Sequence, residues 1–392
     1  MEEVIVVSYG EIILKGLNRP VFEAKLIDNI KNAIKQFGAA TVLKSQARIY
    51  IEPQQFGYDI NSAIAKLSKV FGIVSLSKAY KVECDMDIIR KTALEAARSE
   101  FNYKNKKTFK VECRRGNKNF ELNSLEINAD VGGYILNNMD GLKVDVISPE
   151  FKVYIEVREY AYIYTSKTRA CGGMPFGTNG KAVLLLSGGI DSPAAGWMIA
   201  KRGVEIETVH FFSYPYTGER AKQKVIKLCE ILSEYFGKLR LNVVHFTDIQ
   251  LAVYDNCPDE LITLIMRRIM MRISEKIANN IGANALITGE SIGQVASQTI
   301  QALVVTDEAV NMPVFRPCIG MDKEEIIQIA QKIGTFDTSI LPYEDCCTVF
   351  VPKHPDIRPR INKVIEAEQS LNLEELILKS MHNIEVIDIG GY

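Results

Sequence analysis

The chain has 392 residues and a formal net charge of −1, with 47% of the residues hydrophobic and 24% charged. This composition is typical of a soluble globular protein of two or three domains. A net charge this small also excludes a strong electrostatic field around the whole protein, so a nucleic-acid partner would have to bind a local patch.

The sequence predicts neither export nor membrane insertion. Its first residues, MEEVIVVSYG, are acidic where a secretion signal is basic, and no apolar run reaches the roughly 18 residues of a membrane span. We therefore expect a cytoplasmic protein. The eight cysteines include no C-x-x-C pair and accompany only four histidines, which argues against a disulfide framework and a structural zinc site.

Two small α/β units are expected in the first 165 residues. In residues 1–58, strands over 4–10 and 41–53 flank a helix from about Pro20 to Phe37. In residues 59–165, helices are expected over 59–70, 85–101 and 125–139, and strands over 72–83, 107–115, 143–148 and 152–164. Residues 166–181 are rich in Gly, Thr and Lys and predict a linker to a third domain, 182–392.

Positive charge is concentrated in NYKNKKTFKVECRRGNKNF, residues 102–120. The stretch contains a single acidic residue, Glu112, and the rings of Tyr103, Phe109 and Phe120 are interleaved with its cations. Cations neutralise phosphates and rings stack on unpaired bases, so the pattern favours RNA binding. A solvated edge strand kept soluble by its lysines is the alternative. The cations are Lys104, Lys106, Lys107, Lys110, Arg114, Arg115 and Lys118.

The third domain opens on KAVLLLSGGIDSPAAGWMIAKRG, residues 181–203, which predicts a strand, a glycine turn and a helix. The apolar run 182–186 lacks helical spacing and favours a buried parallel strand, and Pro193 suits the first turn of a helix. Backbone N–H groups and the positive helix end at such a turn attract phosphate. A capped Gly-Gly turn without a ligand is the alternative.

The residues of this turn suit a pyrophosphate. Two hydroxyls and a carboxylate surround the glycines, and Mg²⁺ would bind Asp191. The turn consists of Ser187, Gly188, Gly189, Ile190, Asp191 and Ser192. It resembles the S-G-G-x-D-S motif of the ATP pyrophosphatase family, whose members cleave ATP between the α- and β-phosphates. The resemblance implies adenylation of a substrate oxygen.

The order of the parts resembles, over essentially the whole chain, the tRNA 4-thiouridine synthetase (tRNA sulfurtransferase) family. That family joins a ferredoxin-like piece, a THUMP RNA-binding domain, a linker similar to GGMPFGTNGK and a doubly wound PP-loop domain carrying S-G-G-I-D-S-P; the opening YGEIILKGLNRPVFE is also similar. The resemblance implies ATP-dependent conversion of the uridine at position eight of tRNA to 4-thiouridine. It implies a cysteine desulfurase as sulfur donor, and the sequence is compatible with a homodimer.

Further residues are assigned to an ATP site. The strand EIETVHFF, residues 205–212, brings His210 and Phe211 beside the anion loop, where adenine would lie, and Leu185 and Leu186 would supply backbone contacts.

Two later segments complete the expected site. Arg267 and Arg268 lie off the apolar face of a long helix over 260–282; they are either surface charges or phosphate ligands. LITGESIGQVASQT predicts a second strand–glycine–helix turn, with Gly289 admitting a ligand and Gln298 a turn or two inside the helix. The resemblance places Arg267, Gly289 and Gln298 in the nucleotide site.

A sulfur carrier is expected in PYEDCCTVFVPKHP, residues 342–355. A persulfide needs an accessible thiolate, and Lys353, His354 and Lys323 are near enough in sequence to lower a thiol pKa. The resemblance assigns the persulfide to Cys346, with Cys347 second. Four other cysteines, Cys84, Cys113, Cys229 and Cys318, are interpreted as buried small hydrophobes.

Longer members of the family carry a C-terminal rhodanese domain, and this chain is expected to be a short form without it. A contribution to thiamine thiazole synthesis, which depends on that domain, is left open. Two other functions are the alternatives. An amidotransferase-type synthetase needs a glutaminase domain, which residues 1–165 do not show, and a non-enzymatic tRNA-binding protein leaves Asp191 and the cysteine pair without a role.

Overall fold

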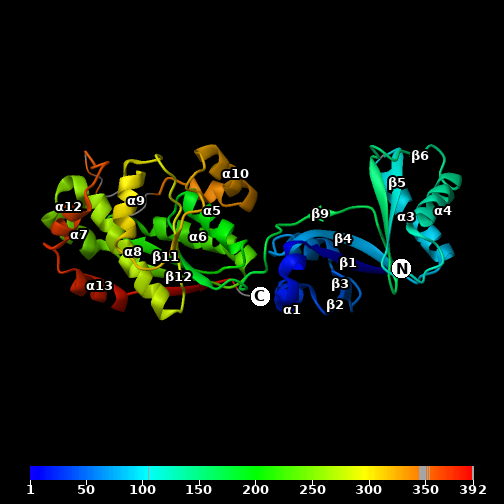
Figure 1. Cartoon of the computed structure of the whole chain (residues 1–392), viewed down its shortest axis with the longest axis horizontal. Coiled ribbons are helices and arrows are strands. Elements are labelled where there is room, and N and C mark those ends of the chain that lie inside the picture. Colours follow the sequence, from blue (N-terminus) through cyan, green and yellow to red (C-terminus); the bar gives the residue numbers. More distant parts are fainter. Residues whose placement is uncertain (105, 344–349, 351, 353, 391–392) are drawn as a thin grey trace. The chain divides into compact units, whose positions relative to one another are not determined.

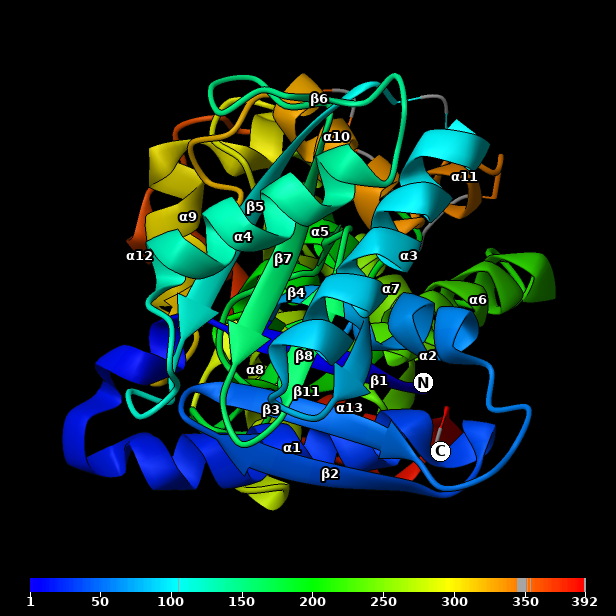
Figure 2. The same cartoon turned by 90° about the vertical axis from the view of Figure 1, so that its right-hand side faces the viewer.

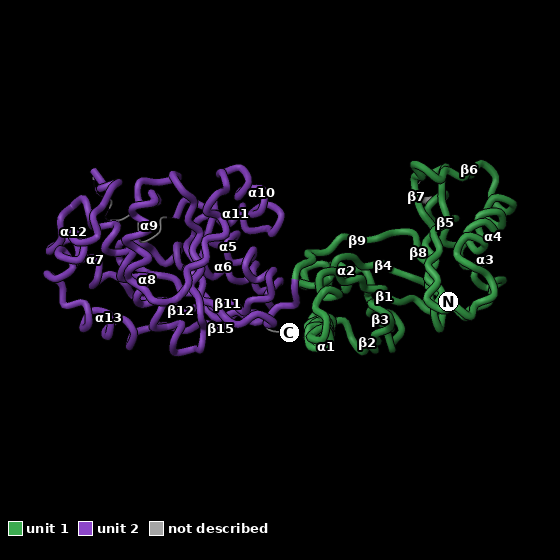
Figure 3. Tube along the Cα trace, in the orientation of Figure 1, with its two compact units in different colours: residues 1–173 green, residues 174–392 purple. Residues whose placement is uncertain are grey.

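A computed structural model describes residues 1–392 except 105, 344–349, 351, 353 and 391–392, and the side chains of 102–104. The chain divides into two units, residues 1–173 and 174–392 (Figure 3). In the described part of the chain, no helix combines the length and the apolarity needed to cross a lipid bilayer.

The first unit is built on one mixed sheet with the strand order β2-β3-β1-β4-β8-β7-β5-β6, and β9 pairs with β4 (Figure 1). Its elements are β1 (Glu2–Tyr9), η1 (Glu11–Asn18), α1 (Arg19–Ile34), η2 (Lys35–Phe37), β2 (Ala40–Ser45), β3 (Arg48–Pro53), α2 (Ile60–Leu67), β4 (Ile73–Val82), α3 (Met86–Lys104), β5 (Thr108–Arg115), α4 (Ser124–Asn137), β6 (Lys143–Val144), β7 (Phe151–Val157), β8 (Ala161–Tyr164) and β9 (Thr168–Arg169).

Alternation along β5 explains how the second half of this sheet is covered. Phe109, Val111 and Cys113 are buried and pack with residues of α3 and α4. Figure 2 shows these two helices running beside β5 and β7. Residues two apart point to the same side of a strand, so Lys110 and Arg114 lie on the opposite face.

The structure differs from the sequence prediction at three places in this unit. β4 pairs with β1 along residues 2–9 and with β8 at residues 80–82, so the segments on either side of residue 58 share one sheet. The strand expected over 152–164 is a hairpin of β7 and β8, and the strand expected over 143–148 is shortened to the two residues of β6. These differences arise because strand pairing is non-local, and local alternation does not show where a strand turns back.

The second unit is a doubly wound sheet with the order β14-β13-β10-β11-β12-β15, parallel except for the edge strand β15. Its elements are β10 (Lys181–Leu185), α5 (Asp191–Ala200), β11 (Glu205–Phe212), α6 (Glu219–Phe236), β12 (Leu239–His245), α7 (Thr247–Asn256), η3 (Asp259–Leu261), α8 (Ile262–Asn280), β13 (Leu286–Ile287), η4 (Ala296–Gln298), α9 (Ile300–Asp307), β14 (Val314–Phe315), α10 (Lys323–Ile333), α11 (Phe336–Ser339), α12 (Ile361–Glu368), α13 (Leu373–His382) and β15 (Glu385–Ile389).

The strand order creates a crevice beside β10. The chain leaves β10 for β11 and β12 on one side and returns to β13 and β14 on the other. Ligands bind doubly wound sheets at such a switch point, outside the carboxyl ends of the strands. The anion loop predicted from the sequence follows β10 directly and therefore lies at this crevice.

The long helix α8 packs its apolar face into the core of this unit, as its spacing predicts. The surface-charge alternative is wrong for Arg268, whose side chain is 1% exposed. Its guanidinium donates to Glu368 on α12 at 2.7 Å and to Glu308 beside α9 at 2.8 Å. Burial alone would raise the pKa of Glu368, but Arg268 and Arg272 hold it below its usual value. This buried ionic cluster ties α12 to α8 and α9.

Candidate nucleotide-binding site

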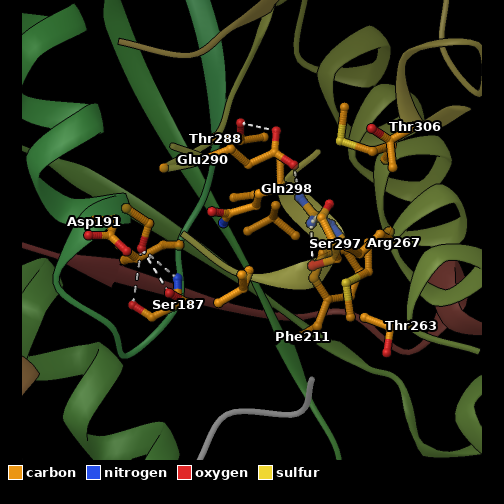
Figure 4. A pocket seen from close by; sticks show the side chains of 18 of the residues that line it. Ser187, Asp191, Phe211, Thr263, Arg267, Thr288, Glu290, Ser297, Gln298 and Thr306 are labelled. Atoms are coloured by element: carbon orange, nitrogen blue, oxygen red, sulfur yellow. Dashed lines mark hydrogen bonds and ion pairs between the residues drawn. The ribbon is translucent and has the colours of Figure 1, made fainter. Parts of the chain in front are cut away.

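A cavity of about 330 Å³ lies at the carboxyl edge of the second sheet, at the switch point between β10 and β13 (Figure 4). Ten of the twelve residues predicted for the ATP site line it: Leu185, Leu186, Ser187, Asp191, Ser192, His210, Phe211, Arg267, Gly289 and Gln298. The other two, Gly188 and Gly189, belong to the adjoining anion loop and do not line the cavity.

Ser192 closes the anion loop onto itself. Its hydroxyl accepts from the backbone N–H of Ser187 at 2.9 Å and lies 3.1 Å from the Ser187 hydroxyl. The backbone N–H of Gly189 donates to the Ser187 hydroxyl at 3.2 Å. These bonds fix the turn just before α5, whose N-terminal N–H groups and dipole favour an anion. The loop is therefore pre-formed for phosphate.

The structure gives Gly289 a reason to be glycine that the sequence did not show. A Cβ atom at this position would lie 2.6 Å from the Ser192 nitrogen and 2.7 Å from the Asp191 carbonyl carbon. These are backbone atoms, so the missing side chain lets the loop after β13 approach the first turn of α5. Gly289 also lines the cavity, and its predicted approach to a ligand stays a prediction.

Asp191, the expected Mg²⁺ ligand, is paired with a lysine. Lys323, at the start of α10, donates to its carboxylate at 2.7 Å. The sequence associates Lys323 with the sulfur carrier, but its described partner is at the anion loop. Within the described residues no three His, Cys, Asp or Glu side chains gather as a metal site. A single carboxylate still fits Mg²⁺, which takes few protein ligands and binds mainly to substrate phosphates and water.

The strand β11 supplies a further part of the cavity wall. The Nδ1 atom of His210 lies 3.0 Å from the Leu186 carbonyl oxygen, and because a carbonyl only accepts, Nδ1 carries the proton of this bond. The ring of Phe211 packs on that of Phe246 with 5.1 Å between centroids. The first contact holds the end of β11 against the residue after β10, and the second holds it against the segment after β12. The sequence predicts adenine beside these residues.

Arg267 reaches the cavity from α8, and its side chain is 19% exposed. One guanidinium nitrogen, Nη1, donates to the backbone oxygen and the hydroxyl of Ser297, both at 3.0 Å. The other, Nη2, pairs with Glu290. Arg267 is thus held by protein acceptors, whereas the sequence suggests only a phosphate ligand or a surface charge.

Gln298 occupies the short 3-10 turn η4, not a helix interior. The predicted strand–glycine–helix turn is wrong here, because α9 begins only at Ile300 after an irregular segment that follows β13. The side-chain oxygen of Gln298 is buried and has no hydrogen-bond partner among the described residues. In the cavity wall, such an acceptor is available to a ligand donor.

Sequence reasoning missed nine residues that line the cavity: Val209, Thr263, Met270, Met271, Thr288, Glu290, Val295, Ser297 and Thr306. Thr288 and Glu290 flank Gly289 in the segment already singled out, so its position after a strand could have included them. Thr263, Met270 and Met271 lie on α8 at positions three or four residues from Arg267, a signal in the helical period. Nothing local marked Thr306.

The predicted sulfur carriers, Cys346 and Cys347, lie outside the described residues, as does Lys353; His354 is described and exposed. Cys113, Cys229 and Cys318 are buried as expected, and Cys84 is partly exposed. Burial raises the pKa of Cys229 to about 12 and that of Cys318 to about 11, so neither thiol is prepared to react as a thiolate.

The basic stretch is divided between bound and outward cations. Lys106 pairs with Glu100 at 2.8 Å, Lys110 donates to the Val146 carbonyl at 3.3 Å, and Arg115 donates to the Phe120 carbonyl at 3.0 Å.

The remaining described cations of the stretch point outward. Lys107 and Lys118 are exposed, and the side chain of Arg114 is 61% exposed beside Glu112. The side chain of Lys104 is outside the described part. β6 pairs only with Thr108 and Phe109, so the rest of β5 lies at a sheet edge. RNA binding by these cations stays a prediction.

Family models match the chain in three consecutive segments. The model described as "Thiamine biosynthesis protein (ThiI)" matches residues 177–373, a ThiI ferredoxin-like domain matches 4–77, and a THUMP domain matches 83–166. The predicted fold class is thereby confirmed. The boundaries predicted at residues 58, 165 and 181 stay proposals.

Curated relatives share these segments over their full length. A probable tRNA sulfurtransferase of Acetivibrio thermocellus is 60% identical, covering 99% of this chain and 99% of the relative. Another, of Alkaliphilus oremlandii, is 48% identical and covers 100% and 99%.

Two solved structures are similar as well. A 4-thiouridine synthetase in complex with RNA and bound ATP has a TM-score of 0.92 and 40% identity, covering 99% of this chain and 100% of that one. PH1313 from Pyrococcus horikoshii has a TM-score of 0.67 and 29% identity, covering 85% and 99%.

Proposed function

Because the chain belongs to the ThiI family, we infer that it is an ATP-dependent tRNA sulfurtransferase that forms 4-thiouridine. The observation that carries this inference is the pre-formed S-G-G-I-D-S loop at the switch-point cavity, in a chain similar along its whole length to a 4-thiouridine synthetase. We propose the uridine at position eight as the target.

The cavity suits ATP in an extended arrangement. The β- and γ-phosphates would lie over the anion loop at the start of α5, where the N-terminal N–H groups and the positive end of the helix dipole favour an anion. The N–H groups of Ser187 and Gly189 donate to hydroxyls of the loop and hold the turn in shape. The base would lie toward Phe211 and α8. The Lys323 ammonium, beside the Asp191 carboxylate, is within reach of the same phosphates.

Mg²⁺ bound at Asp191 would neutralise charge on the departing pyrophosphate. Asp191 and the phosphates themselves would hold it. For the carboxylate to do so, its contact with Lys323 has to lengthen, and the lysine can then follow the pyrophosphate.

The chemistry has two displacements. The C4 oxygen of uracil attacks the α-phosphorus, pyrophosphate leaves, and the N3 proton is lost, which leaves C4 joined to AMP through oxygen. A cysteine persulfide then attacks C4 with its outer sulfur and AMP leaves. A second thiol cleaves the S–S bond, which leaves sulfur on C4 and a disulfide that a reductant must reopen.

We propose Cys346 as the persulfide carrier and a cysteine desulfurase as the source of its sulfur. A disulfide between neighbouring cysteines strains the intervening peptide, so Cys347 is expected to be dispensable in a single turnover, with an external thiol completing the step. In the first unit, the outward cations Lys107, Arg114 and Lys118 are the proposed tRNA contacts.

The test is single-turnover thiolation of tRNA with α-labelled ATP and a desulfurase. Wild-type protein should release AMP and form 4-thiouridine. Cys347→Ser should retain both, whereas Cys346→Ser should lose thiolation. Full activity of Cys346→Ser would overturn the carrier assignment, failure of Cys347→Ser alone would transfer the role to Cys347, and absence of AMP release from the wild type would overturn the function.

A further inference from the structure

A buried carboxylate at the cavity, Glu290, has no part in the mechanism above. Its side chain is 6% exposed, and both of its oxygens are occupied. One pairs with Arg267, and the other accepts from Arg316 at 2.6 Å and from the Thr288 hydroxyl at 2.8 Å. Arg316 is in turn paired with Asp307 on α9. Glu290 is therefore a fixed acceptor for two arginines and is not placed to act as a general base.

Glu290 determines which part of the Arg267 guanidinium can contact a ligand. One terminal nitrogen of the Arg267 guanidinium pairs with Glu290, and the other donates two hydrogen bonds to Ser297. The N–H groups at this edge of the guanidinium are therefore directed at protein acceptors. A guanidinium whose edge is engaged in this way still has two planar faces. Those faces stack on aromatic rings by cation–π attraction.

The place of Arg267 in the cavity fits a ring and not a phosphate. Figure 4 shows Ser187 and Asp191 on one side of the cavity and Arg267, Ser297 and Phe211 on the other. Met270 and Met271, three and four residues after Arg267 on α8, also line the cavity. Apolar side chains with a few fixed polar groups are what a nucleobase requires.

We propose that Glu290 is a positioning residue, which holds the Arg267 guanidinium as a flat wall against the adenine ring and keeps it from the phosphates. The inference rests on the proposed function, because it takes the cavity as the ATP site. It adds that Arg267 contributes to recognition of the base and that this role depends on the Glu290 charge.

The experiment measures the equilibrium affinity of the full chain for adenosine, AMP and ATP without RNA or sulfur donor. Arg267→Gln should weaken all three ligands by one common factor, between about twofold and thirtyfold, because the base is what they share. Glu290→Gln keeps the shape but removes the charge, so it should weaken adenosine more than ATP, since the released arginine can now reach phosphate.

A double variant separates positioning from general loss of structure. If Glu290 acts through Arg267, the Arg267→Gln/Glu290→Gln protein should bind adenosine as Arg267→Gln alone does. Glu308→Gln is the matched control, because Glu308 pairs with the neighbouring Arg268 of α8 and does not line the cavity; its nucleotide affinities should equal those of the wild type.

Three results would overturn the proposal: loss of ATP affinity with unchanged adenosine affinity in Arg267→Gln, unchanged adenosine affinity in Glu290→Gln, or additive losses in the double variant. Should Glu290→Gln fail to fold, the Arg267→Gln comparison alone still decides between base and phosphate. Nucleotide binding by the wild type supports the proposed function whichever way the variants behave.

Discussion

Gly289→Ala tests whether the loop after β13 fixes the anion loop. The added methyl group would lie 2.6 to 2.8 Å from the Ser192 nitrogen, the Asp191 carbonyl carbon and the Ser192 Cα. All three are backbone atoms in the first turn of α5, which cannot rotate away as a side chain can. Ordinary contact therefore requires one of the two segments to move by somewhat less than an ångström.

The expected cost has two parts. Forcing a methyl group into a packed contact costs about 1–3 kcal/mol of unfolding free energy, which lowers the melting temperature by roughly 2–4 °C per kcal/mol in a unit of this size. Misplacing reacting groups by about 1 Å costs on the order of a hundredfold in rate. The variant should therefore remain folded but lose about two orders of magnitude in single-turnover AMP release.

The assay compares Gly289→Ala with Gly320→Ala by calorimetry, ATP affinity and AMP release in the presence of tRNA. Gly320 belongs to the same unit, a methyl group added there would have nothing within 4 Å, and its backbone is not left-handed, so its variant should behave as wild type. Normal ATP affinity and normal AMP release in a folded Gly289→Ala protein would refute the close approach on which the reasoning depends.

Three further predictions concern Asp191, the basic stretch and Glu23. Asp191→Asn should abolish AMP release while tRNA affinity, measured by filter binding, stays within about threefold of the wild type, because the carboxylate belongs to the anion loop and contacts Lys323; equal loss of both would contradict this separation. Replacing Lys107, Arg114 and Lys118 by alanine should reduce the log–log salt slope of tRNA binding by roughly 0.9 for each lost duplex phosphate contact, and an unchanged slope would return the stretch to a solvated edge strand. Burial alone would raise the pKa of Glu23, but donors from Lys44 and two other side chains lower it to about 2, so its contribution to stability is complete above its usual value of 4.5 and lost as the pH falls toward 2. Acid unfolding of Glu23→Gln should therefore be flatter than that of the wild type over this range, and parallel curves would count against the contact.

The sequence by itself determined several of the elements and the anion loop. Apolar periodicity located β1, β10, β11 and α8, because the spacing of apolar residues identifies the buried side of a helix or strand within a few residues. The order Ser-Gly-Gly-Ile-Asp-Ser between a strand and a helix was enough to predict phosphate binding, since the donors at such a turn are backbone groups and their direction is set locally. Ten of the twelve predicted ATP-site residues do line one cavity.

Only the tertiary structure decided which charges are buried and with whom they pair. Arg267 and Arg268 are adjacent on α8 and looked alike, yet Arg267 turns to Glu290 at the cavity and Arg268 to Glu368 on α12. Gly289 needs to be glycine because of α5, and Asp191 is paired with a lysine that begins α10. Each of these partners is distant in sequence and is brought into contact only when the helices and strands pack together, which leaves no periodic trace in the residues themselves.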